Sequence, residues 1–233
     1  MGLFESVQQL LQNVDLWNLF RQPQPIYETL TLEFLSSFSY ITPTGATNQL
    51  SGVTKFHMFG TEYQLSQTDI ARFLGFSSDE GVHLRVPDNF SEEAFNLWHN
   101  MTNIRADSYD HLNATHIHNP AILYFHRILC NTIFARDSNH KLNSKELFFM
   151  QCAFTGQKIN AAPFLLAHIH SICASGGKPF YFRGIVTSLA LALNLGADLT
   201  NMPSMAPTLL TLDHCKAAHL IYEREDGKFH PVI

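Results

Sequence analysis

One stretch in the middle of the chain, residues 119–136 (NPAILYFHRILCNTIFAR), constrains the fold more than any other. Asn119 can cap a helix, and Pro120 suits the first helical turn, where a missing N–H costs nothing. Apolar side chains then recur at helical spacing on two stripes, one formed by Ile122, Phe125, Leu129 and Ile133 and the other by Leu123, Cys130 and Phe134. A helix that is apolar on nearly all sides belongs inside a domain, with neighbours on both faces. We therefore expect this stretch to be the central helix of a helical core.

Two further helices should follow the central one after short turns. Asn143, with Glu146 three residues later, is a capping-box variant that starts a helix over 144–154, and Gly156 ends it. Asn160 caps the next helix, which Gly176-Gly177 stops. Neighbouring helices joined by short turns pack antiparallel, so we expect 119–176 to form a helical bundle.

The remaining helices are expected on both sides of this bundle. Ser66 and Asp69 form a second capping box before a helix that Gly75 ends, and Ser91 with two glutamates opens another. Hydrophobic spacing predicts the other helices over 3–20, 26–40, 185–194 (stopped by Gly196) and 213–221.

The hydrophobic period changes to two in residues 53–65, where apolar residues alternate around Gly60-Thr61. This pattern predicts a short β-hairpin, and residues 82–86 are a second candidate strand. We expect a mainly α fold: a single helical domain with small β-hairpin additions. The expected organisation is an N-terminal helix and linker (1–25), a mainly helical domain (26–222) and a C-terminal tail (223–233).

The charge is unevenly distributed along the chain. Residues 1–110 hold 5 Lys and Arg against 13 Asp and Glu, whereas residues 111–233 hold 10 against 7. Neither half has the basic density of a dedicated nucleic-acid-binding domain. A nucleic-acid-binding role nevertheless stays open through a basic rim around the central helices, formed by Arg127, Arg136, Lys141, Lys145 and Lys158. A solvated charged face explains the same residues.

The cysteines and the apolar runs bear on the compartment. Four cysteines lie far apart, and three of them fall in apolar helical patterns, which is typical of reduced thiols used as small hydrophobes. The longest apolar run, 185–195, is much shorter than the ~20 residues of a membrane span. We expect an intracellular protein, in the cytoplasm or nucleus, with no membrane span.

No catalytic motif is present, whether Gly-x-Ser-x-Gly, His-Glu-x-x-His or a phosphate-binding Gly-x-x-x-x-Gly-Lys loop. Cys130 lies one turn from His126, and Cys173 three residues from His170, but a cysteine nucleophile needs a histidine that a third group orients. Both pairs fall among buried aliphatic residues, so we interpret them as packing. We expect no catalytic residue, no metal ligand, no cofactor and no small-molecule substrate.

A metal-dependent hydrolase centred on His116 and His118 is an alternative. These histidines alternate before the central helix, with Asp107 and Asp110 nearby. A zinc site needs three or four ligands at defined spacing, and this segment offers two with certainty. Loop or capping histidines are the simpler interpretation.

Several segments together resemble a known family. They are 27–37 (YETLTLEFLSS), 59–63 (FGTEY), 74–76 (LGF), 116–136, 143–149 (NSKELFF) and 162–166 (APFLL). In this order they resemble the first-open-reading-frame proteins of plant Athila-type long-terminal-repeat retrotransposons, and the unit 53–76 is more distantly similar to plant mobile domains. The resemblance implies an origin in a transposable element and carries no catalytic residues.

The sequence therefore favours a retrotransposon-derived, non-enzymatic module for protein interaction or assembly, with a protein partner or self-association. Binding of nucleic acid through the basic rim is the first alternative, and the metal-dependent hydrolase is the second. The protease turn Asp-Thr-Gly, the polymerase turn Tyr-x-Asp-Asp and a Cys-x-x-Cys knuckle, which enzymes and nucleocapsids of such elements would show, are missing from the chain.

Overall fold

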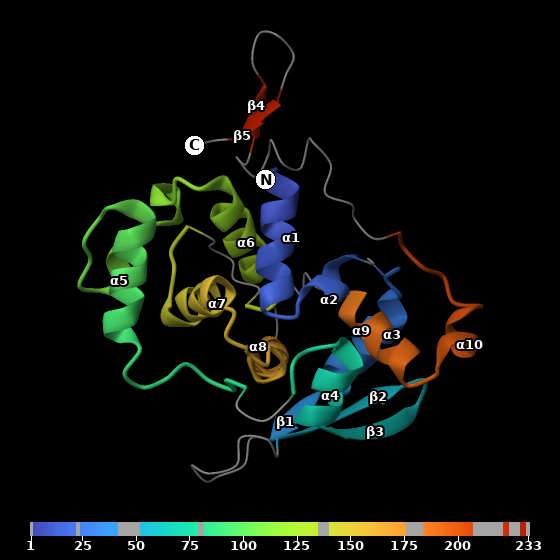
Figure 1. The fold of residues 1–233 in the computed structure, drawn as a ribbon. Helices are drawn as coiled ribbons and strands as arrows, with labels where there is room; N and C mark the ends of the chain where they lie inside the picture. Colours follow the sequence, from blue (N-terminus) through green and yellow to red (C-terminus); the bar gives the residue numbers. More distant parts are fainter. Residues whose placement is uncertain are drawn as a thin grey trace.

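Helices that are distant in sequence pack together in the larger part of the molecule. The computed structural model describes residues 2–21, 24–41, 52–78, 82–134, 140–175, 184–206, 221–223 and 229–231. In Figure 1 the N-terminal helix α1 lies beside α6, and it packs against both α6 and α7, while α5 covers the other side of α7. These elements are α1 (Leu3–Asn13), α5 (Ser91–Thr102), α6 (Pro120–Asn131) and α7 (Ser144–Thr155). The helix α8 (Ala162–Ser175) contacts α7 through Phe164 and Phe149 but packs mainly against the elements around the sheet, so the bundle expected over 119–176 is formed only in part. The expected mainly α fold is confirmed.

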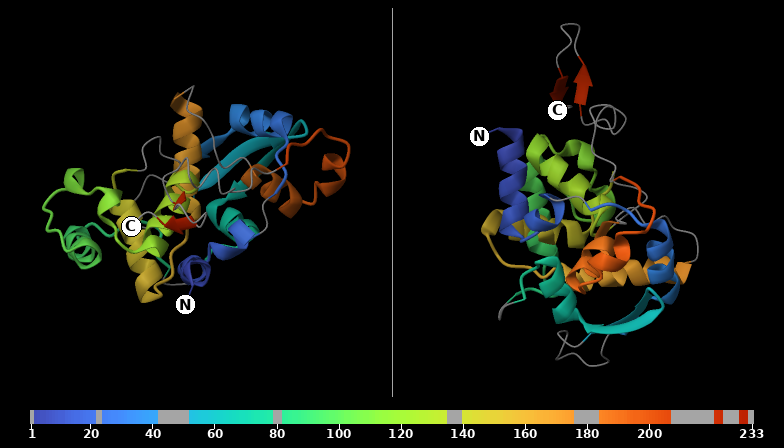
Figure 2. Two further views of the ribbon diagram at one scale, coloured as in Figure 1. Left: turned by 90° about the horizontal axis from the view of Figure 1, so that it is seen from above. Right: turned by 90° about the vertical axis from the view of Figure 1, so that its right-hand side faces the viewer.

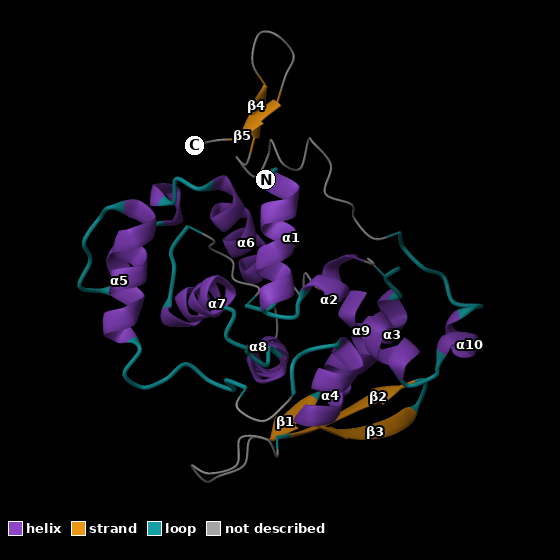
Figure 3. Ribbon diagram, in the orientation of Figure 1, coloured by secondary structure: helices purple, strands orange, loops and turns teal. Residues whose placement is uncertain are grey.

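A small antiparallel sheet lies at one side of this helical body (Figures 2 and 3). Its strands are β1 (Ser39–Ile41), β2 (Val53–Met58) and β3 (Thr61–Ser66), in the order β1-β2-β3. Phe56 lies opposite Tyr63 in the register, so the hairpin expected over 53–65 is confirmed. Sequence periodicity missed β1, which lies at the end of the segment expected to be helical over 26–40.

One face of the sheet is covered by α3 (Glu28–Ser37), and α4 (Gln67–Leu74) follows directly from β3. Alternate residues of β2 (Thr54, Phe56 and Met58) are buried on that face. The Glu33 carboxylate of α3 also accepts hydrogen bonds from the backbone N–H groups of Phe59 (3.0 Å) and Gly60 (2.6 Å) at the hairpin turn. Both turn residues have positive φ, 54° and 72°, as a tight hairpin turn requires. A single helix thus fixes both the face and the turn of the hairpin.

The predicted helix caps are present. Ser66 and Asp69 form a capping box at α4, and Asn143 and Glu146 form another at α7. Gly75 and Gly156 end these two helices with φ of 74° and 71°. The Asn119 side chain accepts a hydrogen bond from the Ala121 N–H, and Pro120 occupies the first turn of α6. These local signals set where the helices begin and end.

Three predictions about individual elements are wrong. The helix expected over 3–20 is two helices, because the chain turns after α1 at Asp15, whose φ is 54°, before α2 (Trp17–Arg21) begins. The turn lets Leu16 enter the core. Residues 82–86 contribute a single bridge, His83 to Ile159, in place of a strand. Gly196 begins the short helix α10 (Gly196–Leu199) and does not itself end α9 (Gly184–Ala192).

The C-terminal region has two short strands, β4 (Ile221–Glu223) and β5 (Phe229–Pro231), which pair antiparallel. Ile221 begins β4, and the rest of the helix expected over 213–221 lies outside the described residues. The division of the chain at residues 25 and 222 stays a prediction.

Aromatic side chains fill much of the core. Phe134, Phe149 and Phe164 meet edge to face, with ring centroids 5.1–6.2 Å apart. Near the sheet, the ring centroid of Phe34 lies 5.3 Å from that of Phe38 and 5.0 Å from that of Phe56. Within the ranges described, no helix has the length and apolar character needed to cross a bilayer.

Candidate functional site

Two polar side chains of α6 lie together in the core. His126 and Cys130 are four residues apart, so they project from the same side of the helix, one turn apart. Both are 0% exposed, and Cys130 Sγ lies 3.2 Å from His126 Nε2. Both residues are buried, as expected from their interpretation as packing, but their polar atoms also contact each other.

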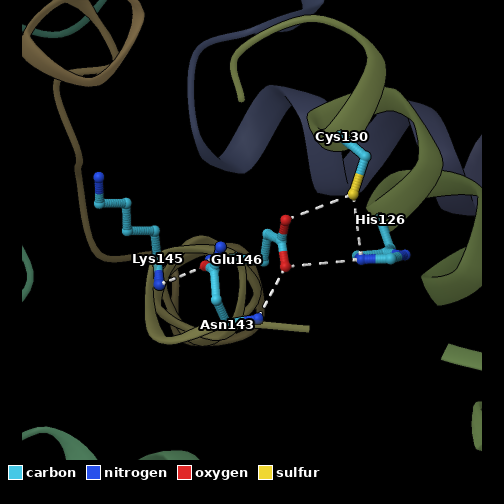
Figure 4. Close-up of polar contacts among 5 residues, drawn as sticks. All are labelled: His126, Cys130, Asn143, Lys145 and Glu146. Atoms are coloured by element: carbon cyan, nitrogen blue, oxygen red, sulfur yellow. Dashed lines mark hydrogen bonds and ion pairs between the residues drawn. The ribbon is translucent and has the colours of Figure 1, made fainter. Parts of the chain in front are cut away.

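The third member of the group comes from α7. The Glu146 carboxylate points from the first turn of α7 toward α6, as Figure 4 shows. Its Oε1 accepts a hydrogen bond from the Cys130 thiol at 3.4 Å, and its Oε2 lies 3.8 Å from His126 Nε2. Glu146 is also 0% exposed. We call His126, Cys130 and Glu146 the His-Cys-Glu cluster.

Glu146 is held in place by its second role as the capping residue of α7. Its Oε2 accepts a hydrogen bond from the Asn143 N–H at 2.8 Å, while the Asn143 side chain accepts bonds from Lys145 N–H and Glu146 N–H. An acidic residue in the first turn also interacts favourably with the helix dipole. The capping box therefore orients one carboxylate oxygen toward the backbone and leaves the other for Cys130.

The cluster is an unusual concentration of ionisable groups in a dry core. A buried carboxylate needs strong partners, because transfer of an unpaired charge from water is costly. Cys130 has one thiol proton, which it donates to Glu146 or to His126 but not to both. Among the residues that the structure describes, His126 Nδ1 is buried and has no hydrogen-bond partner. The polar contacts of His126 within the cluster are therefore made by Nε2 alone.

Among the described residues, the three side chains of the cluster are also close enough together to hold a metal ion. One ligand atom from each side chain lies within 4.8 Å of the other two. Nitrogen, sulfur and oxygen donors of this kind are those that zinc accepts in proteins. All three side chains are closed off from solvent, so a dissolved substrate has no path to the sulfur in this conformation.

The residues of the basic rim are dispersed. Lys145 is exposed near the start of α7 and points away from the His-Cys-Glu cluster (Figure 4), whereas Lys158 follows the opposite end of that helix. Lys158 Nζ forms an ion pair with Asp15 at 3.0 Å, which ties it to the turn after α1. Arg127 on α6 is half-buried, and burial lowers the pKa of its guanidinium.

The other two rim positions complete this picture. Lys141 is exposed and pairs through its backbone with Asn113 in an isolated bridge. Arg136 lies outside the described residues. The assignment of the five rim residues to nucleic-acid binding stays a prediction.

The histidines near residue 117 do not join a metal-binding group in the described part of the chain. His116 is half-buried at the end of a 3₁₀ turn and faces the Trp98 ring, with centroids 6.2 Å apart, whereas His118 is exposed. Asp107 instead contacts His111 at 3.2 Å. The hydrolase alternative therefore lacks the ligand set that it needs at this place.

The sequence contained part of the signal for the His-Cys-Glu cluster. The spacing of His126 and Cys130 places them on one helical face, and Glu146 is recognisable as a capping residue. What the sequence did not reveal is that α6 and α7 pack with these faces together, which places Glu146 within 3.4 Å of a side chain 16 residues earlier. The third group beside the Cys130–His126 pair is therefore Glu146, which comes from the neighbouring helix α7.

Comparison with known proteins bears on the N-terminal two thirds of the chain. The model of the ATHILA ORF-1 family matches residues 1–157, a segment that extends from α1 through α7. No curated protein and no solved structure matches the chain. The matched segment includes all three residues of the His-Cys-Glu cluster.

Proposed function

The chain belongs to the ATHILA ORF-1 family, which confirms the resemblance to Athila-type plant retrotransposon proteins, and from this premise we propose that it is a non-enzymatic module for protein interaction or assembly. Its place of action in this proposal is the cytoplasm or nucleus. The closed packing around the His-Cys-Glu cluster supports a structural use of the most reactive side chains in the core.

Large apolar side chains on the surface carry the proposal. Phe4 on α1, Leu32 on α3 and Ile41 at the end of β1 are 65%, 61% and 60% exposed. Burial of one such side chain against a partner stabilises a complex by about 1.5–3 kcal/mol. Each of the three can therefore anchor a protein contact on its own element, which is why we infer self-association or a protein partner.

Light scattering on the full chain after size exclusion tests this role. We expect a mass above that of the monomer, increasing with protein concentration. The combined variant Phe4→Ser, Leu32→Gln and Ile41→Thr should return the mass toward the monomer. Leu191→Gln, which replaces an apolar side chain of 43% exposure on α9, is the matched control and should leave association unchanged. A wild-type chain that stays monomeric and captures no partner from plant extract contradicts the proposal.

Nucleic-acid binding remains a second candidate because Lys141 and Lys145 are exposed within four residues of each other. The same column run with a labelled oligonucleotide separates the two roles. Binding through phosphate contacts weakens steeply with salt and should fall on Lys145→Ala, whereas Lys55→Ala on the sheet should have no effect. No co-elution at low salt removes this candidate.

A further inference from the structure

We propose that His126 Nε2, Cys130 Sγ and the Glu146 carboxylate bind one zinc ion that fastens α6 to α7. This inference goes beyond the interaction role and does not depend on it. It also reverses the expectation from sequence that the chain has no metal ligand.

The spacing of the three donor atoms fits a tetrahedral ion. Zinc bonds of about 2.0–2.3 Å and tetrahedral angles place neighbouring ligand atoms about 3.3–3.6 Å apart. In the cluster, Cys130 Sγ lies 3.2 Å from His126 Nε2, the two oxygens of the Glu146 carboxylate lie 3.4 Å (Oε1) from the sulfur and 3.8 Å (Oε2) from the nitrogen, and one donor atom from each side chain lies within 4.8 Å of the other two. Small shifts of long side chains suffice to bring each donor to bonding distance. The three side chains are thus preorganised around a common point.

Charge balance favours a divalent ion at this point. A thiolate, a carboxylate and a neutral imidazole carry two negative charges, which one Zn²⁺ neutralises. A neutral centre avoids the cost of an isolated charge in a core where all three residues are 0% exposed, and the charge of the half-buried Arg127, which interacts electrostatically with Cys130, adds to the charges around it. The imidazole then coordinates through Nε2 and retains its proton on Nδ1.

The donor set also selects among metals. A thiolate ligand disfavours Mg²⁺ and Ca²⁺, which prefer oxygen donors, whereas nitrogen, sulfur and oxygen together suit Zn²⁺. The described residues supply three of the four ligands of a tetrahedral ion. Because the ligands come from two helices, the ion cross-links α6 and α7 and stabilises the folded chain by mass action.

Binding requires loss of one proton. The Cys130 S–H bond breaks as the Zn–S bond forms, and the proton passes to solvent. The affinity therefore falls as the pH is lowered, because protons compete with zinc for the ligand atoms. A cluster that is held together by hydrogen bonds alone binds no zinc at any pH.

Metal content and a cobalt spectrum of the full chain test the site. The chelator-treated protein is loaded with Zn²⁺ or Co²⁺ alone and freed of unbound ion by gel filtration. We expect one zinc per chain by elemental analysis. Cobalt should give the thiolate-to-metal charge-transfer band in the near ultraviolet and the intense visible bands of a tetrahedral ion.

Matched cysteine variants identify the ligand. Cys130→Ala should lose the charge-transfer band and weaken zinc binding by about 100-fold or more, beyond what loss of an outer-shell contact causes. Cys152→Ala removes another fully buried thiol and should leave both unchanged. Glu146→Gln should keep the band but bind zinc more weakly, and circular dichroism confirms that each variant is folded. A wild-type chain without the band, or a Cys130→Ala variant that binds like Cys152→Ala, overturns the proposal.

Discussion

At the scale of single residues, two buried cysteines show how surroundings decide what a thiol does. Cys130 and Cys152 are both 0% exposed. Cys130 contacts His126 and Glu146, whereas Cys152 is a residue of α7 that lies in the hydrophobic core. Burial raises the pKa of the Cys152 thiol from its ordinary value of 9.0 to about 12. The thiolate is the reactive form, so Cys152 should stay inert in the folded chain.

Cys152 should make the folded state sensitive to alkaline pH. Because its pKa is raised in the fold, its contribution to stability is fully present below pH 9.0 and is lost as the pH rises toward about 12. Between pH 7 and 10 we expect this group to cost about 1 kcal/mol of the free energy of unfolding. Urea unfolding at both pH values should show that Cys152→Ala loses less free energy of unfolding between pH 7 and 10 than the wild-type chain. Met150→Leu, a buried change on the same helix without a titrating group, should keep the wild-type loss; an equal loss in all three chains contradicts the assignment.

At the scale of elements, two capping boxes of the same design have different surroundings. The carboxylate of Asp69 at α4 is partly exposed and pairs with Arg72 at 2.7 Å, and its hydrogen bond with Ser66 lowers its pKa. The carboxylate of Glu146 at α7 is buried and joins the His-Cys-Glu cluster. The first box has only a local role, whereas the second connects two helices.

The two boxes should respond differently to loss of the capping side chain. Ser66→Ala and Asn143→Ala should each lower the free energy of unfolding of the metal-free chain by about 1 kcal/mol. Only Asn143→Ala should also weaken zinc binding, by about tenfold, because the Asn143 side chain accepts hydrogen bonds from the Lys145 and Glu146 N–H groups and so holds the first turn that carries the carboxylate. Urea unfolding and zinc titration of both variants measure the two effects. Equal zinc affinities would show that the capping box does not position the carboxylate.

Which elements the sequence predicts depends on the range of the interactions that define them. Caps such as Ser66 with Asp69 are set by residues three positions apart, so they were predicted correctly. The strand β1 is three residues long and depends on pairing with β2, so periodicity assigned it to a helix. The turn at Asp15 and the position of Glu146 likewise depend on packing between distant helices, which no local pattern contains.

At the scale of the whole molecule, the folded unit extends beyond the segment that the family model matches. That segment ends at residue 157, but α8 packs against α3, α4 and β1, and α9 packs against α3 and α4. The large buried side chains of α8 are Phe164, Leu165, Leu166, Ile169 and Ile172. At about 2 kcal/mol each, their burial stabilises the fold by on the order of 10 kcal/mol, which is comparable with the entire stability of a domain.

A chain that ends at residue 157 should therefore fail to fold as a unit. Without α8 and α9, the parts of α3 and α4 that pack against these two helices lose their cover and meet water. We expect chain 1–157 to unfold in urea without a cooperative transition. Far-ultraviolet circular dichroism and the fluorescence of the buried Trp98 measure the unfolding. Chain 1–206 keeps α8, α9 and α10 and is the matched control, which should unfold like the full chain. A sharp transition of chain 1–157 at the full-length midpoint would show instead that the matched segment has a complete core of its own.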